Sequence, residues 1–206
     1  MARMAEYSEK VFDHLNHPRH SGLLTEAGLD PATEKLFSAD AGPTPRGDRL
    51  TLTVKLRTAD ERILDAGFQA TGRMPIPSAS CFCEMILGKT LDEALQITVQ
   101  DLNQALGGLP EVRHRQPVLV VETLDTIARR LRGLPPRARP QPGEAPICVC
   151  YHVPEAEIER AIRQQGLKTV EEVTAATQAG NGCGTCHQDI EEIIARCERG
   201  EYKYPV

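Results

Sequence analysis

The chain has few of the side chains that proteins use to bind nucleic acids. It contains no tryptophan, and aromatic residues make up only 4% of its 206 residues, so a platform for stacking bases is not expected. The formal net charge is −5. Residues 147–206 hold ten acidic and six basic side chains, so this segment lacks the basic surface of a nucleic-acid-binding domain.

Long apolar runs are missing as well. No segment approaches the roughly 20 apolar residues that a membrane-spanning helix needs. The N-terminal stretch MARMAEYSEKVFDHLNH has no apolar core of the kind that a secretory signal peptide carries. We therefore expect a cytoplasmic protein that does not associate with membranes. Its 40% hydrophobic content is enough for a packed interior.

Cysteine, in contrast, is plentiful, with seven residues in the chain. An odd number of cysteines cannot pair completely, and disulfides are rare in the reducing cytoplasm, so a disulfide framework is not expected. Metal ligation and packing in the core are the two remaining explanations for these thiols.

A proline-rich segment divides the chain. GLPPRARPQPGEAP, residues 133–146, contains five prolines and two glycines, which prevent a helix or strand from crossing it. We predict a first domain over residues 1–132 and a second over residues 147–206, joined by this linker. The second domain is so small that its hydrophobic core alone would be marginal without a metal or another cross-link.

The first domain is predicted to be α+β. YSEKVFDHLNH places its apolar residues on one helical face, and Ser8 is suited to cap that helix. Alternation of apolar and polar residues in 50–56, together with the strand-like segment 62–70, predicts a β-hairpin. Helical patterns return from Ser78 onward, and Thr90 opens a capping box in TLDEALQI. The expected fold is a small antiparallel sheet beside several helices.

The second domain is predicted to be all-helical. PEAEIERAIRQQG ends at Gly166, TVEEVTAATQAG begins at Thr169, and CHQDIEEIIARCERG runs to Gly200. The first and last of these segments carry an apolar stripe, and we expect each helix to bury one face.

Four cysteines flank these helices in two pairs, Cys148 with Cys150 and Cys183 with Cys186. Glycines around the second pair, in AGNGCGTC, permit the tight backbone that several ligands of one small centre require. Four thiolates can hold zinc or an iron–sulfur cluster. Four-cysteine zinc sites usually combine two pairs of wider spacing, so the C-x-C pair favours a [2Fe–2S] cluster, with structural zinc as the alternative. Either metal centre would contribute folding free energy to the small domain.

The segments ICVCYHV and GNGCGTCHQDIEEII, with a step of 33 positions from Cys150 to Cys183, resemble the central [2Fe–2S] domain of the NifU family. That domain is related to bacterioferritin-associated ferredoxin. The resemblance includes all four cysteine positions. It implies a helix-turn-helix domain with the cluster near its surface, held by Cys148, Cys150, Cys183 and Cys186.

The first domain resembles the scaffold domain shared by NifU and IscU, in YSEKVFDHLNHPRHSG, ILDAGFQATG and GKTLDEALQIT. In that family, three cysteines carry a transient cluster built with sulfur from a cysteine desulfurase. Here all three positions hold arginine, while an aspartate and a histidine of the family's site remain. The corresponding residues are Arg46, Asp48, Arg73, His114 and Arg115.

Arginine cannot accept persulfide sulfur, and three guanidinium groups would repel Fe²⁺ rather than bind it. We therefore hypothesise that the first domain has lost cluster assembly and that its former site is an arginine-lined surface for an anion or a partner. The alternative is that these arginines are ordinary solvated charges, or that they pair with Asp48.

The other thiols and imidazoles are not expected to bind metal. Cys81 and Cys83 lie two residues apart in a predicted helix, so they project to nearly opposite sides of it and cannot close on one ion. We expect both in the core, together with Cys197 on the apolar stripe of the last helix. The histidines expected at the surface or in turns are His14, His17, His20 and His187.

These residues favour a NifU-like accessory protein of iron–sulfur cluster assembly, linked to nitrogen fixation and without enzymatic activity of its own. Its expected partners are a cysteine desulfurase and cluster-accepting or redox proteins, and a homodimer is left open. The alternative is a ferredoxin-like electron-transfer protein whose first domain is an interaction module. A structural zinc protein is the third hypothesis.

Overall fold

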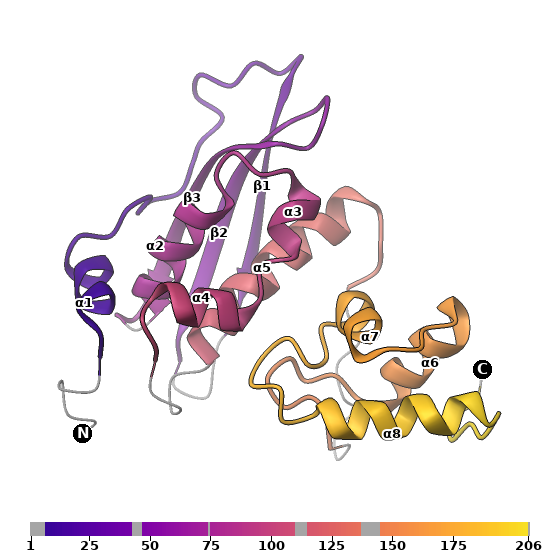
Figure 1. Ribbon diagram of the computed structural model, residues 1–206. Coiled ribbons are helices and arrows are strands. Elements are labelled where there is room, and N and C mark those ends of the chain that lie inside the picture. The colour runs from indigo at the N-terminus through magenta and orange to yellow at the C-terminus, as the bar shows by residue number, and fades with distance from the viewer. Residues whose placement is uncertain (1–6, 43–46, 74, 110–114, 137–144, 206) are drawn as a thin grey trace. The chain divides into compact units, whose positions relative to one another are not determined.

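The computed structural model describes residues 7–42, 47–73, 75–109, 115–136 and 145–205 (Figure 1). The chain forms two compact units, Met1–Pro135 and Pro136–Val206. The division between them, after Pro135, falls inside the proline-rich segment 133–146. The two units are described separately below.

The first unit is built on a three-stranded antiparallel sheet. Its strands are β1 (Glu34–Ala41), β2 (Arg49–Arg57) and β3 (Ile63–Thr71), in the order β1-β2-β3. The predicted hairpin is confirmed, because β2 and β3 pair from Arg49 and Thr71 toward their turn. Strand β1 was not predicted. Its sequence, EKLFSADA, buries only two alanines fully, so it lacks the strong apolar alternation of β2.

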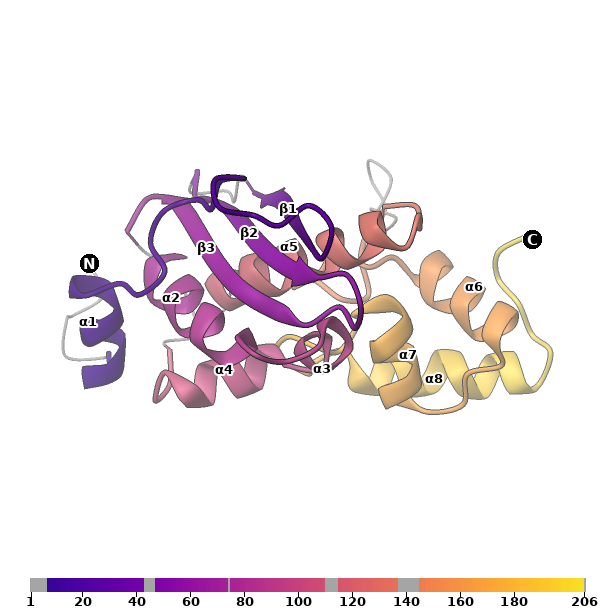
Figure 2. The same cartoon turned by 90° about the horizontal axis from the view of Figure 1, so that it is seen from above.

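Two helices, α2 (Pro75–Ile86) and α5 (Arg115–Leu131), pack directly against this sheet. The other helices of the unit pack mainly on α2 or α5: α1 (Glu9–Asn16), α3 (Leu91–Leu95) and α4 (Val99–Ala105). Figure 2 shows the sheet as one layer, with α2 and α5 in a second layer against it. Alternate residues of β2 point into this interface and are at most 2% exposed: Leu50, Leu52, Val54 and Leu56. Burial of each such side chain contributes about 1.5–3 kcal/mol, so β2 supplies four stabilising side chains to the core of the first unit.

The predicted caps of the first unit are confirmed. The Ser8 hydroxyl accepts a hydrogen bond from the Val11 backbone N–H at 3.2 Å. Thr90 and Glu93 bond each other's backbone N–H groups in a capping box at the start of α3. Each such cap satisfies helix N–H groups that have no partner within the helix. In the described part of the chain, no helix has both the length and the apolar character needed to cross a membrane.

Within residues 145–205, the second unit forms three helices as predicted: α6 (Glu155–Gln165), α7 (Val170–Thr177) and α8 (His187–Glu198). Helix α6 ends at Gly166, and Thr169 caps α7 through a capping box with Glu172. The core consists mainly of isoleucines from α6 and α8: Ile158, Ile162, Ile190, Ile193 and Ile194. This core is small, so polar contacts matter for the stability of the unit.

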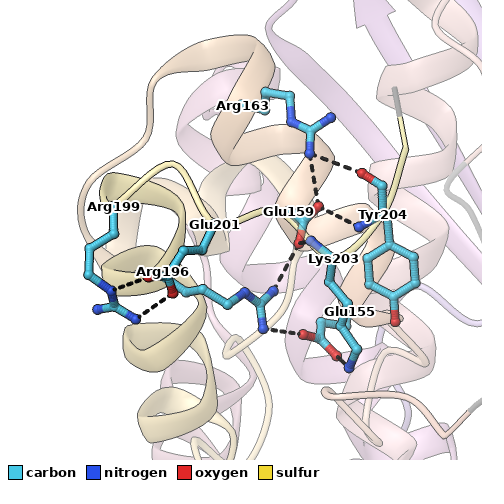
Figure 3. A network of polar contacts seen from close by, with 8 residues as sticks. All are labelled: Glu155, Glu159, Arg163, Arg196, Arg199, Glu201, Lys203 and Tyr204. Atoms are coloured by element: carbon cyan, nitrogen blue, oxygen red, sulfur yellow. Dashed lines mark hydrogen bonds and ion pairs between the residues drawn. The ribbon is translucent and has the colours of Figure 1, made fainter.

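A buried carboxylate ties the C-terminal tail to helices α6 and α8 (Figure 3). The side chain of Glu159 is only 1% exposed and accepts four hydrogen bonds. The Arg163 and Arg196 guanidinium groups donate at 3.0 and 2.9 Å. The backbone N–H groups of Lys203 and Tyr204 each donate at 2.9 Å. Since all four donors converge on one carboxylate, Glu159 fixes three segments at once.

One histidine of the first unit differs from its prediction. His14 was expected at the surface, but it is buried, and its Nδ1 lies 2.9 Å from the Ser80 hydroxyl. The prediction was wrong because α1 packs on α2, and no signal within the α1 sequence shows that Ser80 faces it. Burial, joined by the nearby charge of Arg19, lowers the pKa of His14 below its ordinary value.

Candidate metal centre

The first cysteine pair lies in a tight loop before α6. Cys148 and Val153 form an isolated antiparallel bridge, with N–H to O distances of 3.2 and 3.1 Å in the two directions. The bridge closes the loop and directs Cys148 inward, where it is 2% exposed. Cys150 is half-buried, and Val149 between them is 65% exposed. The loop therefore presents one thiol to the interior and one toward the surface.

The second pair lies in the glycine-rich loop between α7 and α8. Cys183 is exposed, whereas Cys186 is 4% exposed and immediately precedes the first turn of α8. The Cys186 carbonyl accepts the Ile190 N–H at 3.0 Å, so this cysteine is held by the helix. The Thr185 hydroxyl lies 3.0 Å from the Cys183 sulfur.

The two loops bring the four cysteines together. The sulfurs of Cys150 and Cys183 are 3.5 Å apart. Cys148 is hydrogen-bonded to both Cys150 and Cys186, which links the pairs into one group. The four thiols predicted from the sequence thus form a single constellation, although the inner two are 33 positions apart in the sequence.

Gly182 is required by this close approach. An ideal Cβ atom at position 182 would lie 2.6 Å from the Cys150 Cβ and 2.8 Å from its sulfur. Real side chains do not approach so closely, so any other residue would push the two loops apart. The glycine is therefore a steric condition for bringing Cys150 beside Cys183.

The crowded sulfurs perturb each other's ionisation. The hydrogen bond from Cys148, together with burial, raises the pKa of Cys150 well above its ordinary range. The hydrogen bond with Cys148 lowers the pKa of Cys186, helped by backbone hydrogen bonds against the desolvation by burial. Several neighbouring thiols cannot all ionise unless a cationic centre offsets their charge, so this donor set suits a metal centre.

The residues present fit a [2Fe–2S] cluster. All four donors are thiols, and such a cluster takes two cysteines on each iron, which suits sulfurs that are gathered in pairs. Backbone hydrogen bonds from Tyr151 and Gly180 reach the Cys148 sulfur. In the described ranges, no three side chains of histidine, cysteine, aspartate or glutamate are arranged to hold a single metal ion.

The remaining cysteines are buried in the cores of their own units. Cys81 and Cys83 are buried in α2, as predicted, and burial raises their pKa to about 11 and about 12. Cys197 is 5% exposed on the inner face of α8. All three side chains belong to the buried hydrophobic core, so they act as small apolar side chains.

The scaffold-type site that the sequence predicts in the first unit lies only partly within the described residues. Asp48 lies against the loop before α2, since its Oδ1 is 2.7 Å from an ideal Cβ placed at Gly72. Arg73, the next residue, is exposed. Arg115 is the first residue of α5, which begins at the end of the sheet where β2 starts and β3 ends (Figure 1). Arg46 and His114 lie outside the described residues.

His187 is predicted from the sequence to face the solvent. The residue is exposed, but its Nε2 lies 3.0 Å from the carbonyl oxygen of Gly180. A histidine directly after a cysteine is a weak signal, and only the course of the preceding loop reveals its partner.

Comparison with known proteins identifies two regions of the chain. Residues 6–138 match the NifU-like N terminal domain, and residues 146–196 match the BFD-like [2Fe-2S] binding domain. The nitrogen fixation protein NifU of Nostoc sp. is 35% identical over 193 residues, and that of Azospirillum brasilense is 38% identical over 194 residues. Each match covers 93% of this chain, which spans 64% of the Nostoc protein and 60% of the Azospirillum protein.

The first domain also matches shorter proteins. The iron-sulfur cluster assembly scaffold protein IscU 1 of Archaeoglobus fulgidus is 37% identical over 120 residues, which cover 57% of this chain and 71% of that protein. The chain therefore belongs to the NifU family, with an IscU-like scaffold-type domain followed by a BFD-like [2Fe–2S]-binding domain.

Proposed function

We propose that this protein is an accessory protein of iron–sulfur cluster assembly that serves nitrogen fixation and carries one [2Fe–2S] cluster on Cys148, Cys150, Cys183 and Cys186. The observation that carries the proposal is the convergence of these four cysteines, with Cys150 and Cys183 3.5 Å apart, at the two loops that flank the helices. The protein is not an enzyme in this proposal, and it acts in the cytoplasm.

When bound, the cluster supplies one-electron chemistry to this site. The residues of the chain determine how that chemistry is used. Cys148 and Cys186 are buried and anchor the inner side of the centre, whereas Cys183 is exposed and Val149 beside the first pair is 65% exposed. This asymmetry leaves the outer side accessible to a partner protein.

The first domain is proposed to have lost cluster assembly. Asp48 is the one carboxylate retained from the family's site, and arginine stands at all three positions where the family has cysteine. Guanidinium groups stay charged in proteins and bind anions, so the role proposed for these arginines is recognition of an anion or of a protein partner. The partners proposed for the whole chain are a cysteine desulfurase and cluster-accepting or redox proteins, and a homodimer remains compatible with these roles.

The loss of cluster assembly can be tested in the full chain after Cys148, Cys150, Cys183 and Cys186 are all replaced by serine. With Fe²⁺, cysteine and a cysteine desulfurase under anaerobic conditions, we expect no visible iron–sulfur absorption, because no thiol remains at the scaffold positions. The matched control adds Arg46→Cys, Arg73→Cys and Arg115→Cys and is expected to bind a cluster. A stable cluster in the four-serine variant itself would contradict the proposal.

The second candidate function is electron transfer by a ferredoxin-like protein whose first domain only binds partners. The exposure of Cys183 and Val149 favours it, because electron exchange needs a cluster close to the surface. A binding assay with the immobilised chain separates the two functions. Assembly predicts retention of a purified cysteine desulfurase or of an apo-protein that accepts clusters, and retention of a reductase alone would favour electron transfer.

A further inference from the structure

The loop that leads into the second cysteine pair is held on both sides of Gly180. The Thr174 hydroxyl donates a hydrogen bond to the Ala179 carbonyl at 2.7 Å. His187 Nε2 lies 3.0 Å from the Gly180 carbonyl, and because a carbonyl can only accept, this nitrogen carries the proton. The Ala179 carbonyl shares a peptide plane with the Gly180 N–H, so the two contacts fix the consecutive peptide planes that meet at Gly180.

Only glycine fits between these two side chains. Gly180 has a φ of +90°, which is in the left-handed region that favours glycine. An ideal Cβ at this position would lie 2.8 Å from the Thr174 hydroxyl and 3.0 Å from His187 Nε2. Thr174 and His187 therefore enclose the backbone of Gly180 closely.

The backbone of Gly180 faces the four cysteines of the metal centre. The backbone N–H of Gly180 is hydrogen-bonded to the sulfurs of Cys148 and Cys186. Each cysteine pair therefore contributes one of the two sulfurs. A hydrogen bond to a thiolate ligand stabilises the more negative, reduced state of an iron–sulfur cluster and so sets its reduction potential. The hydrogen bond that the Ala179 carbonyl accepts also polarises the Gly180 N–H in the same peptide.

We infer that Thr174 and His187 are positioning residues that hold the Gly180 N–H against the sulfurs of Cys148 and Cys186, and thereby raise the reduction potential of the cluster. The inference rests on the proposed function only in that these cysteines bind the cluster. Cys186 is the N-cap of α8 and His187 is its first residue, so a cluster ligand and one of the two side chains that orient the Gly180 N–H are adjacent at the start of α8.

The inference is tested in the full, cluster-loaded chain with Thr174→Val and His187→Ala. Each variant removes one donor, and each is expected to lower the ratio of reduced to oxidised cluster at a fixed solution potential about tenfold, which corresponds to ~59 mV for a one-electron couple. Loss of cluster to an iron chelator should also become faster. Thr174→Ser and His187→Gln keep a donor near the same place and should restore the potential.

Gln188→Ala is the matched control, since Gln188 is an exposed residue of the same turn of α8. It should leave the potential and the chelator rate unchanged. A wild-type potential in both Thr174→Val and His187→Ala would overturn the inference. If Thr174→Val and His187→Ala do not bind a cluster, the conservative variants decide. Thr174→Ser and His187→Gln proteins that bind the cluster with the wild-type potential would support the inference, and a failure of these two variants to bind a cluster would overturn it. Failure of the proposed function is distinguishable, because the wild-type chain would then show no [2Fe–2S] spectrum.

Discussion

Replacing Cys150 by serine is expected to abolish the visible [2Fe–2S] absorption of the protein and to destabilise its second unit. The Cys150 sulfur lies 3.5 Å from that of Cys183 and is hydrogen-bonded to Cys148, so its loss breaks the link between the two pairs. A core below about 70–80 residues rarely contributes more than 3–5 kcal/mol, and a bound metal centre adds folding free energy that the variant would lack. Visible absorption and circular dichroism of the anaerobically purified variant measure both effects.

Cys197→Ser is the control for this change. Cys197 is in the same unit and is 5% exposed, but it belongs to the apolar face of α8. The substitution should leave the absorption bands in place, as should Cys81→Ser and Cys83→Ser in the first unit. The ligand assignment would be wrong if Cys197→Ser removed the bands or if Cys150→Ser retained the wild-type spectrum. Replacing Cys148, Cys183 or Cys186 by serine should likewise abolish the absorption bands and destabilise the second unit.

Replacing Glu159 by alanine is expected to destabilise the second unit by about 3–5 kcal/mol, the usual cost of removing one partner from a buried charge network. The substitution leaves Arg163, Arg196 and two backbone N–H groups of the tail without their shared acceptor (Figure 3). The urea concentration at which the cluster absorption is lost measures the effect. Glu201→Ala removes an exposed partner of Arg199 and should leave that midpoint unchanged.

The pKa of the Glu159 carboxylate predicts how the stability of the second unit depends on pH. Burial would raise the pKa of Glu159, but hydrogen bonds from the Lys203 and Tyr204 backbone and from Arg196 outweigh it and hold the pKa below the ordinary value of 4.5. A depressed carboxyl pKa stabilises the fold above the unfolded-state pKa, and this stabilisation is lost as the pH falls through the folded-state value. The urea midpoint of the wild-type protein should therefore decrease when the pH is lowered below about 4.5. The urea midpoint of Glu159→Ala should decrease less over the same pH range.

Local signals in the sequence were sufficient for much of the fold. The hairpin of β2 and β3 follows from short-range alternation, and the caps at Ser8, Thr90 and Thr169 follow from residues within one helical turn. The four cysteines could be predicted as one site because thiols in two close pairs are typical of metal centres. Each of these features depends on neighbours in the sequence.

The features that the sequence did not reveal depend on contacts between distant segments. Strand β1 is defined by its pairing with β2, because its own apolar pattern is weak. Glu159 is one of several acids in EAEIER, and nothing nearby shows that the backbone of Lys203 and Tyr204 will reach it. The contact between His187 and Gly180 likewise depends on the left-handed turns of the loop after α7.

Quantitation of iron, acid-labile sulfide and zinc in the anaerobically purified wild-type chain, together with its visible spectrum, tests the central claim most directly. One [2Fe–2S] cluster on the four cysteines predicts about two irons and two sulfides per chain, with absorption bands that bleach on reduction. A colourless protein with about one zinc and no sulfide per chain would contradict the claim and favour a structural zinc site.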